Sequence, residues 1–248
     1  MTLTDAQRER FSRQLVLEGV GEAGQQRLAA ARVLVVGAGG LGSPAAFYLA
    51  AAGIGAIGLV DFDVVSLSNL NRQILHGAGD LGRPKTVSAA ERLRALAPDV
   101  DVIRHAERLD AASAEARVAA YDVVVECSDN FETKFLVNAA CVRAGVPLVW
   151  ASVLGWEGQM SVVVPGRGPC YRCLFPPAVD LDGAPTAREV GILGAVAGVF
   201  GALEALEAVK VLLGVGESLA GRLLVWDGGT GAFETVAFSA QPGCPVCG

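Results

Sequence analysis

The stretch VLVVGAGGLGSPAAFYLAAAGIGAIGLVDFDVVSLSNLNRQ, residues 33–73, decides the fold of this chain. A β-branched apolar run leads into the glycine-rich segment 37–42, an alanine-rich segment of helical character follows, and a second apolar run ends at Asp61. In such a unit the first glycine makes a tight turn, the second lets backbone N–H groups approach a phosphate, and the third allows close packing of helix on strand. The stretch therefore predicts a nucleotide-binding strand, turn, helix and strand.

Two features of this unit can hold a nucleotide. Phosphate is expected on the positive end of the helix that follows the glycines Gly37, Gly39, Gly40 and Gly42. Asp61 stands roughly 20 residues beyond them, where a carboxylate can hydrogen-bond the ribose hydroxyls. The alternative interpretation is a tight turn with a purely structural role.

Composition limits the classes of function. The 248 residues suffice for one large domain, and the net charge of −6 gives no reason to expect nucleic acid as a partner. Two uncharged stretches, 33–60 and 190–203, do not indicate membrane spans, because glycines and a proline break the first and the second is too short. The polar N-terminal segment has no apolar core of a secretory signal. We therefore expect a cytoplasmic protein that binds neither membrane nor nucleic acid.

Four of the six cysteines form two CxxC pairs, which are Cys170 with Cys173 and Cys244 with Cys247. In a reducing compartment such pairs indicate metal ligands, and four thiolates suit a structural zinc with no open position for chemistry. The long gap between the pairs departs from zinc-finger spacing, so the fold must bring them together. A thioredoxin-like redox pair is the main alternative.

Apolar runs alternate with helical segments over residues 31–151, which predicts a parallel sheet with helices on both faces. Binding residues are expected at the carboxyl ends of the strands, where Asp61 and Asp129 can face one crevice. From Gly155 the pattern changes, because an alternating strand leads into the first CxxC pair instead of a helix. The fold class is thus α/β, a Rossmann-like doubly wound sheet continued by a mixed or antiparallel C-terminal part with the four-cysteine zinc site.

The periodicity also sets the extent of the elements. Helices are expected over residues 4–18, 84–97 with a proline at the first helical position, 110–120, 131–144 and 191–214. Strands are expected over residues 33–36, 56–60, 100–105, 122–126, 147–151, 157–164, 222–227 and 231–238. Glycines 19, 21 and 24 indicate a turn, residues 63–82 a loop at the nucleotide edge, and residues 176–189 a long loop. His76 and His105 have no paired spacing and are interpreted as incidental.

Several spaced segments together resemble the MoeB/ThiF family, the ubiquitin-activating-like adenylyltransferases of sulfur-carrier proteins, over nearly the whole chain. The segments are 37–42, 61–63, 68–73, 84–85, 127–130 and the two CxxC pairs. The resemblance implies that the C-terminal glycine of a ubiquitin-fold carrier ending in Gly-Gly attacks the α-phosphate of ATP. With magnesium, this gives an acyl-adenylate and pyrophosphate.

The resemblance also assigns roles to residues. It implies that Asp61 holds the ribose, that Asn69 and Arg72 hold the phosphates, that Lys85 lies near the α-phosphate, and that Asp129 holds the magnesium. Two anions meet in this reaction, so these cations fit the role of preorganised positive charge. The remaining nucleotide-binding candidates are Asp63, Ser68 and Asn130. Taken singly, an Asp or Asn can be a turn or cap residue, and a lysine can be a charge on a helix surface.

In relatives an arginine of the N-terminal helix crosses a dimer interface to the partner's ATP, which implies this role for Arg13 and an obligate homodimer. Some relatives carry a cysteine in the loop before the last long helix. Residues 176–189 contain none, and Cys127 and Cys141 are badly placed to replace it, so adenylation without a covalent thioester is expected. The chain ends at the second CxxC pair, so a separate protein is expected to donate the sulfur.

One continuous globular unit is expected, with an N-terminal helical arm (1–30), a nucleotide-binding region (31–154) and a carrier-binding and zinc-knuckle region (155–248). A carrier of the molybdopterin-synthase type is favoured by the missing loop cysteine. The thiamine-pathway carrier, or several carriers, are alternatives. An NAD-dependent oxidoreductase is an alternative of another class, but it gives no use to Arg72 and Lys85. A zinc-stabilised binding module with a degenerate nucleotide site is a third.

Overall fold

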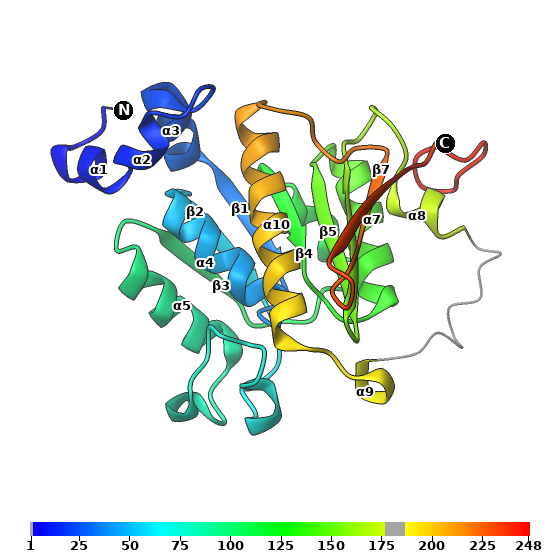
Figure 1. Cartoon of the computed structure of the whole chain (residues 1–248), viewed down its shortest axis with the longest axis horizontal. Coiled ribbons are helices and arrows are strands. Elements are labelled where there is room, and N and C mark those ends of the chain that lie inside the picture. The colour runs from blue at the N-terminus through cyan, green and yellow to red at the C-terminus, as the bar shows by residue number, and fades with distance from the viewer. Residues whose placement is uncertain (1, 177–186) are drawn as a thin grey trace.

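The computed structural model describes residues 2–176 and 187–248, which are built around one eight-stranded sheet (Figure 1). The strand order is β3-β2-β1-β4-β5-β6-β7-β8; the first five strands are parallel and the last three each run antiparallel to the strand before. The strands are β1 (Arg32–Val36), β2 (Ala56–Val60), β3 (Asp101–His105), β4 (Val123–Glu126), β5 (Leu148–Leu154), β6 (Glu157–Val163), β7 (Arg222–Asp227) and β8 (Ala232–Ala237). The predicted α/β class, with its antiparallel continuation, is confirmed.

Helices cover both faces of the parallel part of this sheet, with α4, α5 and α10 on one face and α7 on the other (Figure 1). Helix α6 packs on the same face as α7. The α-helices are α1 (Asp5–Arg10), α2 (Ser12–Leu15), α3 (Gly21–Ala30), α4 (Gly42–Ala52), α5 (Lys85–Leu96), α6 (Ala114–Val118), α7 (Phe131–Ala144), α8 (Tyr171–Leu174), α9 (Ala187–Val190) and α10 (Gly194–Leu213). Two short 3-10 helices, η1 (Leu67–Asn69) and η2 (Ala78–Asp80), lie in the segment between β2 and α5.

Strand β1 shows why the sheet needs two helical layers. Val33 and Val35 pack into the core under α4 and α10, whereas Leu34 and Val36 pack into the core on the α7 side. All four side chains are buried because side chains alternate between the two faces of a strand. A run without polar positions is therefore the signature of a central parallel strand.

The structure corrects the expected elements in several places. The turn expected at glycines 19, 21 and 24 is largely α3, because the Glu, Gln, Arg, Leu and Ala residues around Gly24 are good helix formers and one glycine among them costs only about 1 kcal/mol. The helix expected over 4–18 is two short helices divided at Phe11, and Pro84 is the cap of α5, not its first residue. The helix expected over 110–120 begins only at Ala114, because the Asp110 carboxylate accepts the N–H groups of the following residues in a turn.

The change of pattern expected at residue 155 is a change of strand direction. Strand β5 turns back into β6 at Gly155, which has a φ of 60°, and antiparallel pairing continues from there to β8. The proposed division of the chain at this point stays a prediction. Most of the loop expected over 176–189 lies outside the described residues, which resume at α9. Among the helices described, none is both long and apolar enough to cross a membrane.

Candidate active site

A crevice is expected at the carboxyl ends of β1 and β4, where the strand order reverses direction. Gly37 has a φ of 97°, and a Cβ there would lie 2.9 Å from the carbonyl oxygen of Cys127, so the loops after β1 and β4 touch. A Cβ at Gly42 would lie 1.8 Å from the carbonyl oxygen of Gly37. These two glycines are therefore required by the backbone, and α4 begins directly against the loop.

Between these glycines, the backbone presents unused donors. The N–H groups of Gly39, Gly40 and Leu41 donate no hydrogen bond to any residue that the structure describes. They lie at the start of α4, where the helix dipole is positive, and such groups bind anions. The loop can thus receive a phosphate.

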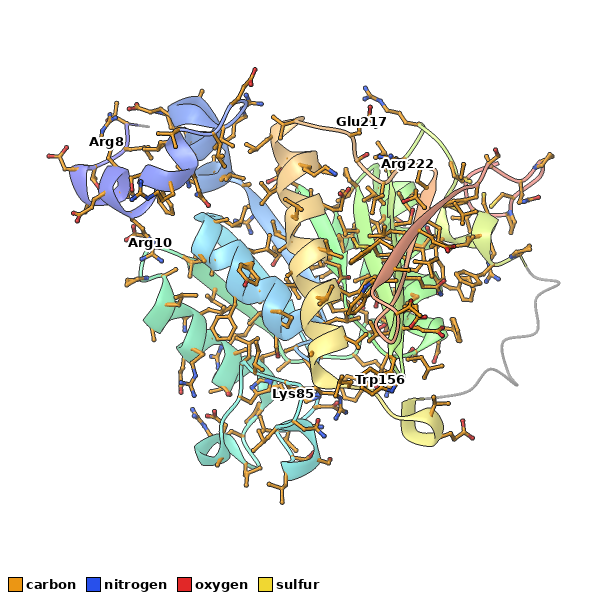
Figure 2. All side chains as sticks on the ribbon, in the orientation of Figure 1. Arg8, Arg10, Lys85, Trp156, Glu217 and Arg222 are labelled. Atoms are coloured by element: carbon orange, nitrogen blue, oxygen red, sulfur yellow. The ribbon has the colours of Figure 1, made fainter. Side chains whose placement is uncertain are left out.

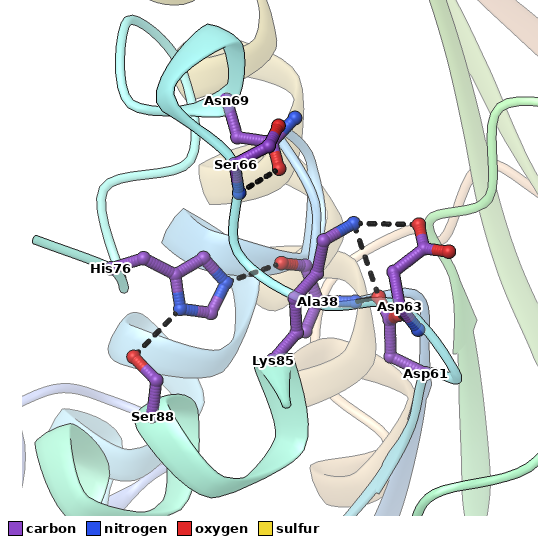
Figure 3. Close-up of polar contacts among 8 residues, drawn as sticks. All are labelled: Ala38, Asp61, Asp63, Ser66, Asn69, His76, Lys85 and Ser88. Carbon is purple, nitrogen blue, oxygen red and sulfur yellow. Dashed lines mark hydrogen bonds and ion pairs between the residues drawn. The ribbon is translucent and has the colours of Figure 1, made fainter. Parts of the chain in front are cut away.

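Asp61 follows β2 and faces this loop (Figure 3). It is 9% exposed, and its Oδ2 accepts the N–H of Ala38 at 2.9 Å while its Oδ1 accepts the N–H of Asp63 at 2.8 Å. Burial raises the pKa of Asp61, and the nearby Lys85 ammonium opposes that rise. Each oxygen has a second lone pair, so the carboxylate can also accept a hydrogen bond from a ligand hydroxyl.

Lys85 is the first residue of α5 and is buried. Its Nζ lies 2.9 Å from Oδ2 of Asp63 and 3.9 Å from Oδ2 of Asp61, so one cation is shared by two carboxylates (Figure 3). The side chain of Asp63 is half exposed. Three of the predicted site residues are therefore brought together at the edge of the glycine-rich loop.

Arg72 comes to the same loop from the segment after η1. Its Nη1 donates to the carbonyl oxygen of Ser68 at 2.9 Å and to Oδ1 of Asn71 at 3.0 Å, and its Cγ would lie 3.5 Å from a Cβ built on Gly40. Asn69 is used locally, because its Oδ1 accepts the N–H of Ser66 and caps η1. Arg72 is thus beside the loop, and Asn69 serves as a cap in this structure.

Asp129 lies in the turn after β4 and is exposed. Its carboxylate makes no hydrogen bond or ion pair with the described part of the chain. Asn130 is the N-cap of α7, since its Oδ1 accepts the N–H of Thr133 at 2.8 Å. The Ser128 N–H donates to Oε1 of Glu126 at 2.9 Å, which fixes the turn to the end of β4. The structure therefore places Asp129 on the loop that touches Gly37.

A buried polar network lies under this turn, and the sequence did not single it out. The Nζ of Lys134 contacts Oε2 of Glu126 and the carbonyl oxygen of Ala151, and the Cys127 thiol donates to Oε2 of Glu204 at 3.4 Å. Burial raises the pKa of Glu204 far above its usual range. Burial thus favours the uncharged form of Glu204, and the Lys134 ammonium is paired with Glu126.

Arg13 is not brought to the crevice within one chain. Helix α2 packs at the far end of α4, where the Gln14 amide donates to the carbonyl oxygen of Ala52, and Arg10 donates to the carbonyl oxygen of Leu96 at the far end of α5. Figure 2 shows Arg10 and Lys85 at opposite ends of α5. Arg13 is exposed and makes no ion pair with another described residue.

The four paired cysteines meet at α8, away from the glycine-rich loop. Their Sγ atoms all lie within 4.8 Å of one another, with separations of 4.0 Å between Cys170 and Cys173, 3.8 Å between Cys170 and Cys244, and 3.4 Å between Cys173 and Cys247. A tetrahedron with zinc–sulfur bonds of about 2.3 Å has edges of about 3.8 Å. The donor set therefore fits a structural zinc. Three of the four thiols are buried, which disfavours the redox-pair alternative.

The other two cysteines, Cys127 and Cys141, are buried as expected. Burial raises the pKa of both thiols. Thiols of this kind are poor nucleophiles because the thiolate is the reactive form.

His76 was interpreted from the sequence as incidental, but it is buried beneath the glycine-rich loop. Its Nε2 lies 3.0 Å from the carbonyl oxygen of Ala38 and its Nδ1 lies 2.9 Å from Oγ of Ser88. His105 contacts the hydroxyl of Tyr121 and lies outside the loop. Spacing between histidines could not reveal this, because the partners of His76 are a backbone carbonyl and a serine.

Comparison with known proteins places the chain in a family. Residues 11–246 match the ThiF family. The chain is 52% identical over 240 residues to the adenylyltransferase and sulfurtransferase MOCS3 of Bos taurus, covering 96% of this chain and 53% of that protein. It is 45% identical over 253 residues to the sulfur carrier protein adenylyltransferase of Thermus thermophilus, covering 100% of this chain and 93% of that protein. The chain thus spans about half the length of the MOCS3 protein.

A solved structure agrees with this placement. The crystal structure of Escherichia coli MccB with ATP superposes with a TM-score of 0.82 at 27% identity, covering 91% of this chain and 68% of that one. The match leaves out less than a tenth of this chain. On the sequence match over residues 11–246 and on the fold, the chain belongs to the ThiF family.

Proposed function

We propose that this protein uses ATP to adenylate the C-terminal glycine of a ubiquitin-fold sulfur-carrier protein. The observation that carries the proposal is the meeting of unused N–H groups at α4 with Lys85, Arg72 and Asp61 at one end of the sheet. Two relatives are named adenylyltransferases, and the MccB structure is described with ATP. The reaction of an oxidoreductase would give Lys85 and Arg72 no chemical role.

The chemistry follows from the positions of the charges. The carboxylate of the carrier's terminal glycine attacks the α-phosphorus of ATP, the bond from that phosphorus to the bridging oxygen breaks, and pyrophosphate leaves. Lys85 and Arg72 would stabilise the negative charge that builds on the phosphates, and Asp61 would accept hydrogen bonds from the ribose. Magnesium, held by Asp129, would neutralise the leaving pyrophosphate. Asp63, Ser68, Asn69 and Asn130 stay candidates for the rim of the nucleotide site.

The carrier is proposed to be of the molybdopterin-synthase type, with the thiamine-pathway carrier or several carriers as alternatives. No covalent link between enzyme and carrier is expected, because the cysteines outside the zinc-type site, Cys127 and Cys141, are buried. A separate protein is proposed as the sulfur donor. The four-cysteine site would hold zinc with a structural role.

The proposal is tested by exchange of radiolabelled pyrophosphate into ATP. With magnesium and a carrier ending in Gly-Gly, the wild-type protein should catalyse exchange that depends on the carrier. Asp129→Ala should lower the rate by about tenfold or more, because one charged contact to the metal–phosphate complex is worth roughly 1.5–3 kcal/mol. Glu132→Ala, an acidic neighbour on α7, should leave the rate unchanged. Absence of exchange with every carrier type, in folded protein, would overturn the proposal.

A homodimer in which Arg13 enters the partner's site is part of the proposal. In one chain α2 is separated from the glycine-rich loop by the length of α4, roughly 16 Å at 1.5 Å per residue. Helix α2 is followed by the exposed apolar side chains of Val16 and Leu17, which are 80% and 55% exposed. Such side chains are typical of a surface that a partner covers.

Mixing two defective variants tests this assignment. Arg13→Ala and Asp129→Ala should each lose exchange by about 10- to 100-fold, because each removes a charged contact. When the two are co-expressed, mixed dimers contain one site with both residues intact, so exchange should reappear. Two variants that form mixed dimers without regaining exchange would show that Arg13 acts within its own chain or not at all.

A further inference from the structure

A closed circuit of polar contacts surrounds the backbone N–H and carbonyl of Ala38 (Figure 3). Ser88 on α5 contacts Nδ1 of His76 at 2.9 Å, and Nε2 of His76 contacts the Ala38 carbonyl oxygen at 3.0 Å. The Ala38 N–H donates to Oδ2 of Asp61 at 2.9 Å, and Nζ of Lys85, again on α5, lies 3.9 Å from that oxygen. The circuit therefore begins and ends on the first turn of one helix.

The partners fix one nitrogen of the imidazole. A carbonyl oxygen can only accept, so Nε2 of His76 carries the proton, and in the neutral ring Nδ1 accepts from the hydroxyl of Ser88. Burial lowers the pKa of His76; the Ala38 carbonyl, Asp61 and Asp80 act in the opposite direction, and Lys85 adds to the lowering. The neutral ring with its proton on Nε2 satisfies both neighbours.

The peptide that follows Ala38 transmits this contact to the loop surface. A trans peptide is planar, so the carbonyl of Ala38 and the N–H of Gly39 point in opposite directions. With the carbonyl held inward against His76, the Gly39 N–H is directed away from the core, and it has no acceptor among the described residues. Without the imidazole, the Ala38 carbonyl would be buried without a partner, and the peptide could rotate.

We propose that His76 is a positioning residue for nucleotide phosphate, which aims the Gly39 N–H group by holding the carbonyl of Ala38. The inference rests on the proposed function, since it concerns how the same loop binds ATP. His76 touches neither nucleotide nor reacting atoms in this account. Its effect is on ATP affinity more than on the rate of the bound complex.

Two amide substitutions separate the two contacts of the His76 side chain. His76→Gln places an amide nitrogen near the position of Nε2 and can keep the bond to Ala38, whereas His76→Asn reaches only the position of Nδ1 and Ser88. ATP binding measured by titration calorimetry should weaken by about three- to tenfold in His76→Asn and by less than about twofold in His76→Gln, as expected for one hydrogen bond. His105→Asn, which removes a similar contact to Tyr121 outside the loop, should bind ATP like the wild type.

Nitrogen-15 NMR of the wild-type imidazole gives a second measurement that needs no variant. It should show His76 neutral with the proton on Nε2, and the opposite tautomer would overturn the inference. Equal ATP affinity in both amide variants, or equal loss in both, would overturn it while leaving the proposed function intact. Failure of the wild type to bind ATP would instead defeat the proposed function, and this inference with it.

Discussion

Lys134→Met will lower the free energy of unfolding by about 3–5 kcal/mol, the cost of leaving a buried charge without its partner. Lys134 is 4% exposed and Glu126 is not exposed at all, so the carboxylate that remains has no access to water. The Ser128 N–H is its other donor. Urea unfolding followed by circular dichroism measures the change.

Arg143→Met provides the matched control on the same helix. Arg143 pairs with Glu115 at 2.7 Å, but both side chains are about half exposed, and such pairs contribute roughly 0–1 kcal/mol. Similar losses in the two variants would contradict the interpretation that burial makes the Lys134 pair decisive.

Glu204→Gln should behave in the opposite way. Burial raises the pKa of Glu204 in the folded protein, so Glu204 stays protonated to a higher pH in the fold than in the unfolded chain. The native state then binds more protons, so stability falls as pH rises through this interval. Glutamine does not titrate, so the variant should gain stability relative to the wild type as pH rises above the ordinary glutamate pKa of about 4.3. A difference independent of pH would show that Glu204 is ionised in the fold.

This network marks the limit of what the sequence could predict. The alternation of apolar runs and helical segments predicted the sheet, and β2, β7 and α7 begin and end where expected, because each is an unbroken pattern with a clear boundary. Glu204 interrupts the apolar pattern of α10, which is a signal, but its partner Cys127 is 77 residues away in the chain. Only the packing of α10 against β4 and β5 brings the two together.

The candidate site likewise contains residues that the sequence could predict and one that it could not. Residues that belong to recognisable segments, such as Asp61, Lys85 and the glycines, could be singled out before the structure. His76 could not, because its contact is with a backbone carbonyl 38 residues earlier, and backbone groups carry no sequence signal. The turn predicted in place of α3 was wrong, because the residues around its glycines tolerate a helix.

Lys85→Met should lower carrier-dependent pyrophosphate exchange by about 10²- to 10³-fold, which is typical for the loss of one preorganised positive group at developing phosphate charge. The ammonium is buried at the start of α5 and lies between two carboxylates, so it is held in place before ATP arrives. A phosphate at the glycine-rich loop would compete with Asp63, whose half-exposed side chain can move aside. Methionine keeps an unbranched side chain out to the ε position and removes the ammonium group with its charge and hydrogen bonds.

The kinetic form of the loss distinguishes catalysis from simple attraction. If Lys85 acts on the charge that develops at the α-phosphate, kcat should fall much more than the affinity for ATP, because that charge is greatest in the transition state. Lys210→Met is the matched control, since Lys210 on α10 pairs with Glu207 away from the loop. A rise in KM at constant kcat would show that Lys85 only attracts the nucleotide, and its assignment to the α-phosphate would then have to be given up.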